Sequence, residues 1–159
     1  MGLFGPSCYC IDTCAVIDLR SYFPDVFPSL WTSLEGMISQ GTLIAPREVF
    51  RELEGKEDEV LKWAKKNKSM FLDPDDQQLQ WVSRIEEEFP GLVDPDKTTA
   101  DADPFVVALA ICSDAAVVTQ ERSVSHRTSS RVRIPDVCAH HRVDCVTLRD
   151  FFKRQGWKF

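Results

Sequence analysis

The sequence predicts an α/β domain whose central, mainly parallel sheet is covered by helices on both faces. Short apolar runs typical of buried strands alternate along the chain with helical patterns, as in parallel sheets with right-handed crossovers. The 159 residues are enough for one core, and no internal repeat or linker divides them, so we expect a single domain over residues 1–159. Apolar residues make up 43% of the chain and charged residues 28%, the balance of an ordinary globular protein.

The first expected strand covers residues 8–11, a short apolar run that is followed directly by Asp12. A helical stretch begins at 15–19, and a loop with two prolines at 22–28 separates it from the next helix. That helix is expected over 28–39, because its apolar residues recur at helical spacing.

The following part of the chain predicts a strand at 42–45 and a helix at 46–53, which opens with the proline favoured at a first helical position. Two further amphipathic helices are expected at 57–67 and 76–89. The polar and acidic segment 92–102 is expected to be a loop.

Asp103 and Pro104 predict the start of a buried helix, with the aspartate as its N-cap and the proline at the first helical position. Residues 105–112 are apolar on all sides, which indicates a helix inside the core. The remaining expected elements are a strand at 115–119, a helix at 134–142, a strand at 144–147 and a helix at 148–155.

Charge and hydropathy exclude several classes of protein. Lysine and arginine number 19 against 25 aspartates and glutamates, a net charge of −6, which argues against a broad basic surface that holds nucleic acid by charge alone. No apolar run approaches the ~18 residues of a membrane helix. The first residues lack the charged and apolar regions of a signal peptide. We therefore expect a cytoplasmic protein with no membrane contact, whose cysteines stay reduced.

Three cysteines fall within the stretch CYCIDTC at residues 8–14, but the chain has no CxxC pair. We interpret these cysteines as small core residues and Asp12 as the functional residue of the stretch. The alternative is a zinc site drawn from Cys8, Cys10, Cys14, Cys138, His140 and His141. Adjacent histidines do not share one helix face, so no paired role is expected for His140 and His141.

Four carboxylates lie next to apolar segments that must pack in one core. Asp12 ends the first strand, and Glu52 lies in the helix after the second strand. Asp103 begins the buried helix, and Glu121 follows the third expected strand by two residues. Because the carboxyl ends of parallel strands meet at one edge of a sheet, all four are expected to converge there. Asp101 is a further candidate, which we interpret as a loop carboxylate.

Carboxylates that share a site repel one another, and a divalent cation removes that repulsion. Oxygen-only ligands favour Mg²⁺ or Mn²⁺ over zinc. Such an ion lowers the pKa of a water molecule and binds phosphate, so the cluster indicates phosphodiester hydrolysis. Taken singly, Asp103 is also explained as a helix cap, and Glu52 and Glu121 as solvated charges.

Four short motifs resemble those of PIN domains in their order and spacing. They are Ile11-Asp12-Thr13, Val49-Phe50-Arg51-Glu52-Leu53, the run from Asp103 to Ala110, and Val117-Val118-Thr119-Gln120-Glu121. Further stretches, such as the ending Gly156-Trp157-Lys158-Phe159, are similar to one bacterial PIN subfamily named only as a domain of unknown function. The resemblance covers nearly the whole chain.

This resemblance implies a PIN-like, Rossmann-like three-layer α/β/α sandwich and a Mg²⁺- or Mn²⁺-dependent endoribonuclease, similar to VapC-type toxins. It implies RNA as substrate, an antitoxin protein as partner and a homodimer. Asp12, Glu52 and Asp103 match the core catalytic acids, and Glu121 stands where the family more often has aspartate. We expect Asp12 and Asp103 to hold the metal directly. Glu52 and Glu121 are expected to hold it through water or to orient the attacking water. Thr13 matches a hydroxyl residue implied to bind water or phosphate.

The segment 121–133 has a local positive charge within an acidic chain. Its arginines are Arg122, Arg127, Arg131 and Arg133. We expect them to flank the site and to contact the phosphates of RNA. The alternatives are a solvated basic loop and a surface for an acidic antitoxin tail.

Two other functions fit part of the pattern. A haloacid-dehalogenase-like phosphatase would need a second aspartate two residues after the first, where this chain has Cys14. A non-catalytic PIN-like module would keep the fold and bind only a partner. Metal titration combined with a nuclease assay separates the non-catalytic module from a ribonuclease, and a phosphomonoester assay tests the phosphatase.

Overall fold

Five parallel strands form one central sheet in the order β3-β2-β1-β4-β5. The computed structural model describes residues 6–56, 58–94, 96, 101–123 and 131–159. The strands are β1 (Tyr9–Ile11), β2 (Leu43–Pro46), β3 (Phe71–Leu72), β4 (Ala116–Val118) and β5 (Cys145–Val146). The predicted α/β class with a parallel sheet is confirmed. Strand β3 was not expected, since two residues that are only partly buried or exposed form no apolar run.

Helices and 3₁₀ turns connect the strands. The helices are α1 (Thr13–Asp18), α2 (Pro28–Ser39), α3 (Arg47–Glu54), α4 (Glu59–Lys66), α5 (Asp76–Glu88), α6 (Asp103–Ser113), α7 (Ile134–His140) and α8 (Leu148–Arg154). The 3₁₀ turns are η1 (Leu19–Ser21), η2 (Lys68–Met70) and η3 (Pro90–Leu92). Among these elements, no helix is long and apolar enough to cross a membrane.

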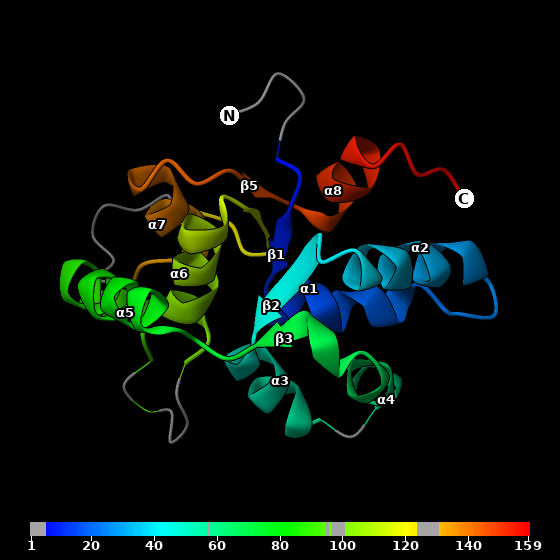
Figure 1. Cartoon of the computed structure of the whole chain (residues 1–159), viewed down its shortest axis with the longest axis horizontal. Helices are drawn as coiled ribbons and strands as arrows, with labels where there is room; N and C mark the ends of the chain where they lie inside the picture. Colours follow the sequence, from blue (N-terminus) through cyan, green and yellow to red (C-terminus); the bar gives the residue numbers. More distant parts are fainter. Residues whose placement is uncertain (1–5, 57, 95, 97–100, 124–130) are drawn as a thin grey trace.

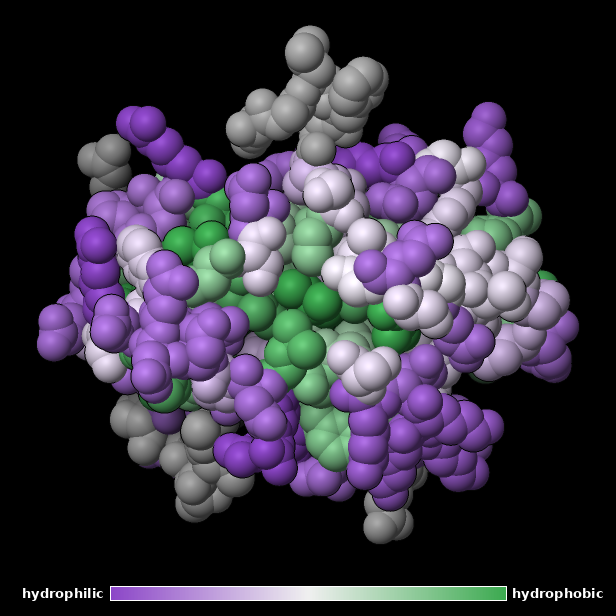
Figure 2. Space-filling model, viewed as in Figure 1, coloured by the Kyte–Doolittle hydropathy of each residue, from purple (hydrophilic) through white to green (hydrophobic). Residues whose placement is uncertain are grey.

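The elements are arranged in three layers. Figure 1 shows α5, α6 and α7 on one side of the sheet, and α1, α2, α3, α4 and α8 on the other. Figure 2 shows hydrophobic residues gathered in the middle of the same face, where the sheet lies in Figure 1, between hydrophilic helix surfaces. The three-layer α/β/α arrangement expected from the sequence is therefore present.

Strand β1 lies at the point where the order of the sheet reverses. From β1 the chain builds β2 and β3 on one side, and later returns through α5 and α6 to place β4 on the other side. Such a switch point forms a crevice beyond the carboxyl ends of the strands. Ile11 of β1 pairs with Val118 of β4. The residues that follow them, Asp12 and Thr119, are therefore neighbours at this crevice.

Helix α6 forms the buried centre of its layer. Its residues from Val106 to Ala110 are all buried, because the helix packs against β1, β2 and β4 on one side and against α5 on another. This enclosure explains why its sequence is apolar on all sides. The helix begins at Asp103 and its N-cap is Ala102, so the expected N-cap role of Asp103 is wrong.

Candidate metal centre

A cavity of about 700 Å³ lies at the switch point of the sheet. The acids predicted from the sequence all line it: Asp12, Glu52, Asp103 and Glu121. They come from four separate elements, namely the end of β1, helix α3, the start of α6 and the segment after β4. The parallel sheet thus brings together carboxylates that are far apart in the sequence.

Asp12 is the most buried of these four acids, with 2% of its surface exposed. Its extended backbone makes it the N-cap of α1, and its Oδ1 accepts a hydrogen bond from the backbone N–H of Thr13 at 2.7 Å. Its Oδ2 accepts hydrogen bonds from the hydroxyl of Thr119 at 2.9 Å and the thiol of Cys14 at 3.0 Å. These donors fix the position of the carboxylate.

Cys14 and Thr119 are site residues that the sequence analysis did not identify. Cys14 lies in α1 rather than on the strand, so its interpretation as core packing is wrong, whereas Cys10 is fully buried in β1 as expected. Burial and the adjacent charge of Asp12 raise the pKa of the Cys14 thiol to about 12, so it remains a protonated donor. Thr119 is 1% exposed, and its hydroxyl also accepts a hydrogen bond from the N–H of Glu121 at 3.1 Å.

Glu52, Asp101 and Asp103 form a compact carboxylate group, in which one oxygen from each lies within 4.8 Å of the others. Asp101 is only 7% exposed. Its Oδ1 accepts a hydrogen bond from the N–H of Asp103 at 3.1 Å, and its Oδ2 accepts one from the N–H of Asp94 at 3.3 Å. Asp101 thus lies in a loop, as expected, but it is buried and belongs to the carboxylate group of the cavity. Its side chain binds the backbone at the start of α6, as expected of Asp103.

Glu52 connects this group to the Asp12 side of the cavity. It comes from the second turn of α3, and its Oε1 accepts hydrogen bonds from the hydroxyl of Thr13 at 3.4 Å and the N–H of Ala102 at 3.2 Å. Thr13 directly follows Asp12, and Ala102 directly precedes Asp103. Glu52 thus joins the two segments that carry the aspartates.

The carboxylates raise one another's pKa. The pKa of Asp103 is raised from 3.8 to about 9, first by burial and then by the charges of the other acids in the cavity. Burial also raises the pKa of Asp12 to about 6, although its hydrogen bonds from Cys14 and Thr119 lower it. A bound divalent cation reverses this effect, because it favours the ionised form of each carboxyl. The donor set contains only oxygen, which suits Mg²⁺ or Mn²⁺.

Glu121 joins the cavity to α7. Its Oε2 accepts a hydrogen bond from the N–H of Ile134, the first residue of α7, at 3.0 Å. The charge of Glu121 also contributes to the raised pKa values of Asp12 and Asp103. The carboxylate therefore has both a structural partner and an electrostatic effect on the cavity.

The model of the family described as "Domain of unknown function (DUF4411)" matches residues 9–159, nearly the whole chain. The chain belongs to this family. No curated protein matches it. Among solved structures, the one titled "Crystal structure of PAE2754 from Pyrobaculum aerophilum" is similar, with 17% sequence identity and a TM-score of 0.43 over 84% of this chain and 95% of that chain.

Basic residues of this DUF4411 chain border the acidic cavity, whose lining includes Lys56, Arg131 and Arg133. Two of the sequence-predicted arginines are thus at the site. Arg122 is exposed and is not among the lining residues, whereas Arg127 lies outside the described residues. Thr13, predicted to contact substrate, lines the cavity as well. The cavity therefore combines carboxylates for a cation with positive charges for an anion.

Proposed function

We propose that the chain is a metal-dependent endoribonuclease of the PIN type, which hydrolyses RNA phosphodiester bonds as the toxin of a toxin–antitoxin pair. The convergence of six acidic residues, the five described above and Asp94, on one cavity at the switch point of a parallel sheet carries this proposal. The acids Asp12, Glu52, Asp103 and Glu121 lie in the motifs that resemble PIN domains. A cytoplasmic location, an antitoxin partner and a homodimer belong to the same proposal.

The cavity residues fit Mg²⁺ or Mn²⁺. Asp103 would be the central ligand, because one of its oxygens lies within 4.8 Å of oxygens from Glu52 and Asp101. Among the neighbouring charges, that of Asp12 also raises the pKa of Asp103 the most. Asp12 would reach the ion from the end of β1. When bound, the ion lowers the pKa of a water molecule and balances negative charge on the phosphate.

The chain's own residues orient the reactants. Asp12 is held in place by Thr119 and Cys14. Glu52 and Glu121 would orient the attacking water for in-line displacement at phosphorus. Outside the acids, Lys56, Arg131 and Arg133 would bind the RNA phosphates.

Two alternative functions share part of this geometry. A haloacid-dehalogenase-like phosphatase needs a general acid two residues after Asp12. The Cys14 thiol at that position has a pKa of about 12 and donates a hydrogen bond to Asp12. A non-catalytic PIN-like module would bind the ion and a partner without turnover. The nuclease proposal places a cation among the acids and RNA phosphates on the basic residues of the same cavity.

A cleavage assay tests the proposal. Purified chain is incubated with an end-labelled pool of RNA in Mn²⁺, in Mg²⁺ and in EDTA. We expect cleavage that needs the ion and that falls at least about a hundredfold in Asp12→Asn and Asp103→Asn. Glu87→Gln, a charge removed from the exposed face of α5, is the matched control and should cleave as the unaltered chain does.

Three results would contradict the proposal. Ion binding without cleavage of any RNA in the pool would favour the non-catalytic module. Release of phosphate from a phosphomonoester, with RNA untouched, would favour a different phosphohydrolase. Cleavage that survives both aspartate substitutions would place the activity outside this cavity.

A further inference from the structure

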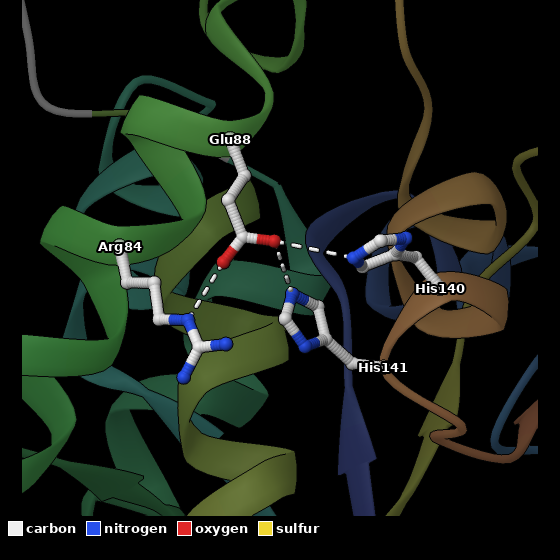
Figure 3. Close-up of polar contacts among 4 residues, drawn as sticks. All are labelled: Arg84, Glu88, His140 and His141. Carbon is white, nitrogen blue, oxygen red and sulfur yellow. Dashed lines mark hydrogen bonds and ion pairs between the residues drawn. The ribbon is translucent and has the colours of Figure 1, made fainter.

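A second cluster of metal-ligating side chains lies outside the acidic cavity, at the ends of α5 and α7. Glu88 is the last residue of α5, His140 is the last residue of α7, and His141 follows it. Figure 3 shows Nε2 of both imidazoles directed at Oε2 of Glu88. The expectation that the adjacent histidines have no paired role is wrong, because His141 has left the helix, with φ −89° and ψ 6°.

The distances in this cluster match those of a zinc site. Oε2 of Glu88 lies 3.2 Å from Nε2 of His140 and 3.5 Å from Nε2 of His141. Ligand atoms around tetrahedral zinc are ~3.3 Å apart, because each bond is about 2.0–2.1 Å long. The three ligand atoms all lie within 4.8 Å of one another. One ion placed between them would thus be in reach of all three.

His141 provides an independent observation. Its side chain is only 8% exposed, and its Nε2 is buried without a hydrogen-bond partner among the residues that the structure describes. A buried polar atom without a partner is costly, and in native proteins it calls for an explanation such as an ion. This atom faces the carboxylate oxygen of Glu88. An ion between the two would satisfy both.

Arg84 orients the carboxylate of Glu88 so that its Oε2 is the oxygen available to a metal ion. Its Nε donates a hydrogen bond to Oε1 of Glu88 at 2.7 Å, so Oε2 is the oxygen that faces the imidazoles. The guanidinium group of Arg84 also lies over the ring of Trp81, 4.8 Å from its centre. Partners of this kind orient metal ligands in known sites.

The ionisation states of Glu88 and His141 suit a bound cation. The hydrogen bond that Arg84 donates to Glu88 lowers the pKa of the Glu88 carboxyl, and burial lowers the pKa of the His141 imidazole. Both shifts favour the forms that bind metal, an ionised carboxylate and a neutral imidazole. The C-terminus of the thirteen-residue helix α5 adds partial negative charge beside the cluster.

We propose that Glu88, His140 and His141 form a zinc-binding site with three protein ligands and a fourth position open to solvent. Mixed nitrogen and oxygen donors suit Zn²⁺, in contrast to the all-oxygen acids of the cavity. The side chain of His140 is 58% exposed and forms the open side.

Zinc at this site would clamp two segments that lead into the acidic cavity. Gly91 follows α5 and Val132 precedes α7, and the N–H of Val132 donates a hydrogen bond to the carbonyl of Gly91 at 3.1 Å. Both residues line the acidic cavity. The zinc site and this hydrogen bond therefore join the same pair of segments at different points.

Zinc retention by the full chain tests the proposal. The protein is stripped with a chelator, loaded with Zn²⁺, desalted and analysed by native mass spectrometry and elemental analysis. We expect one zinc per chain, lost in His140→Ala and in Glu88→Gln and kept in Glu87→Gln, its exposed neighbour on α5. Zinc affinity should fall at least about a hundredfold, since even outer-shell changes cost ~10–100-fold.

A further variant and two further measurements distinguish zinc at this site from zinc in the acidic cavity. Asp103→Asn alters only the acidic cavity and should retain the zinc. Co²⁺ in place of Zn²⁺ should give the visible absorption of a four-coordinate site, absent in His140→Ala. Zinc should also raise the Tm of the unaltered chain and leave that of His140→Ala unchanged. Failure of the unaltered chain to retain zinc, or retention by both His140→Ala and Glu88→Gln, would overturn the proposal, as would loss in Asp103→Asn alone.

Discussion

Asp12 depends for its position and its charge on the donors around it, and Thr119 is one of them. In Thr119→Val the side chain keeps its shape but loses the hydroxyl that donates to Oδ2 at 2.9 Å and lowers the pKa of Asp12. We expect the pKa of Asp12 to rise above about 6, so that RNA cleavage reaches half of its maximum at a higher pH. The free energy of unfolding should fall by about 1–3 kcal/mol, because buried polar groups lose a partner.

The pH profile of cleavage and urea denaturation measure these two effects. Thr32→Val is the matched control, because it removes an exposed hydroxyl that donates to a carbonyl of its own helix. A lower rate with an unshifted pH profile in Thr119→Val would mean that Thr119 acts on stability and not on Asp12.

The residues of the site differ in how well local sequence predicts them. Asp12 could be predicted because it directly follows an apolar run, and a parallel sheet exposes that position at the edge of the strands. Asp101 could not, because its carboxylate lies near that of Glu52, a residue far away in the sequence, only in the folded chain. Thr119 was missed for the same reason, since its partner Asp12 belongs to a distant part of the sequence. Cys14 was missed because it was interpreted as a core residue of the strand, whereas helix α1 directs its thiol to Asp12.

At the scale of secondary structure, periodic segments were predictable and short ones were not. Helix α2 spans Pro28–Ser39 as expected, because its apolar spacing and first proline are local signals. Strand β3 escaped prediction because only its pairing with β2 defines it. The start of α6 was misread because the side chain that bonds to its first turn belongs to Asp101, two residues earlier than Asp103.

A prediction at this scale concerns the start of helix α7, where Glu121 accepts a hydrogen bond from the N–H of Ile134, the first residue of the helix. Glu121→Ala removes this acceptor and should lower the free energy of unfolding by about 1 kcal/mol, the typical effect of a lost helix cap. Glu121→Gln retains a side-chain oxygen and should lose less. Urea denaturation at neutral pH measures both variants. Equal losses would show that the hydrogen bond to Ile134 contributes nothing measurable.

At the scale of the whole molecule, the alternation of strands and helices predicts the parallel sheet and the convergence of the acids. It does not predict which two strands flank β1, and this order determines that Asp12 lies beside Thr119. The fold also concentrates like charges, because an acidic chain with a net charge of −6 places six acidic residues around one cavity. The stability of the whole chain should therefore respond to pH and to divalent cations.

The metal-free chain should lose stability as the pH rises. The pKa values of Asp12 and Asp103, about 6 and about 9, lie above the 3.8 of an unperturbed aspartate, so the folded chain binds more protons than the unfolded chain between those values. The stabilisation is complete below pH ~4 and is lost as the pH passes about 6 for Asp12 and about 9 for Asp103. For Asp12, the change from 3.8 to about 6 corresponds to about 3 kcal/mol at ~1.4 kcal/mol per pH unit.

Urea denaturation in EDTA, at a series of pH values from 4 to 9, measures this dependence against Asp103→Asn. The difference between the two proteins reports on the Asp103 carboxyl together with its repulsion of the neighbouring acids, and the unaltered chain should lose stability relative to the variant as the pH rises. Saturating Mn²⁺ should remove most of this loss, because the ion binds the ionised carboxylates of the folded chain. If the two proteins keep a constant difference from pH 4 to 9 in EDTA, the carboxyl of Asp103 does not have a raised pKa, and the electrostatic argument for a cation among these acids loses its basis.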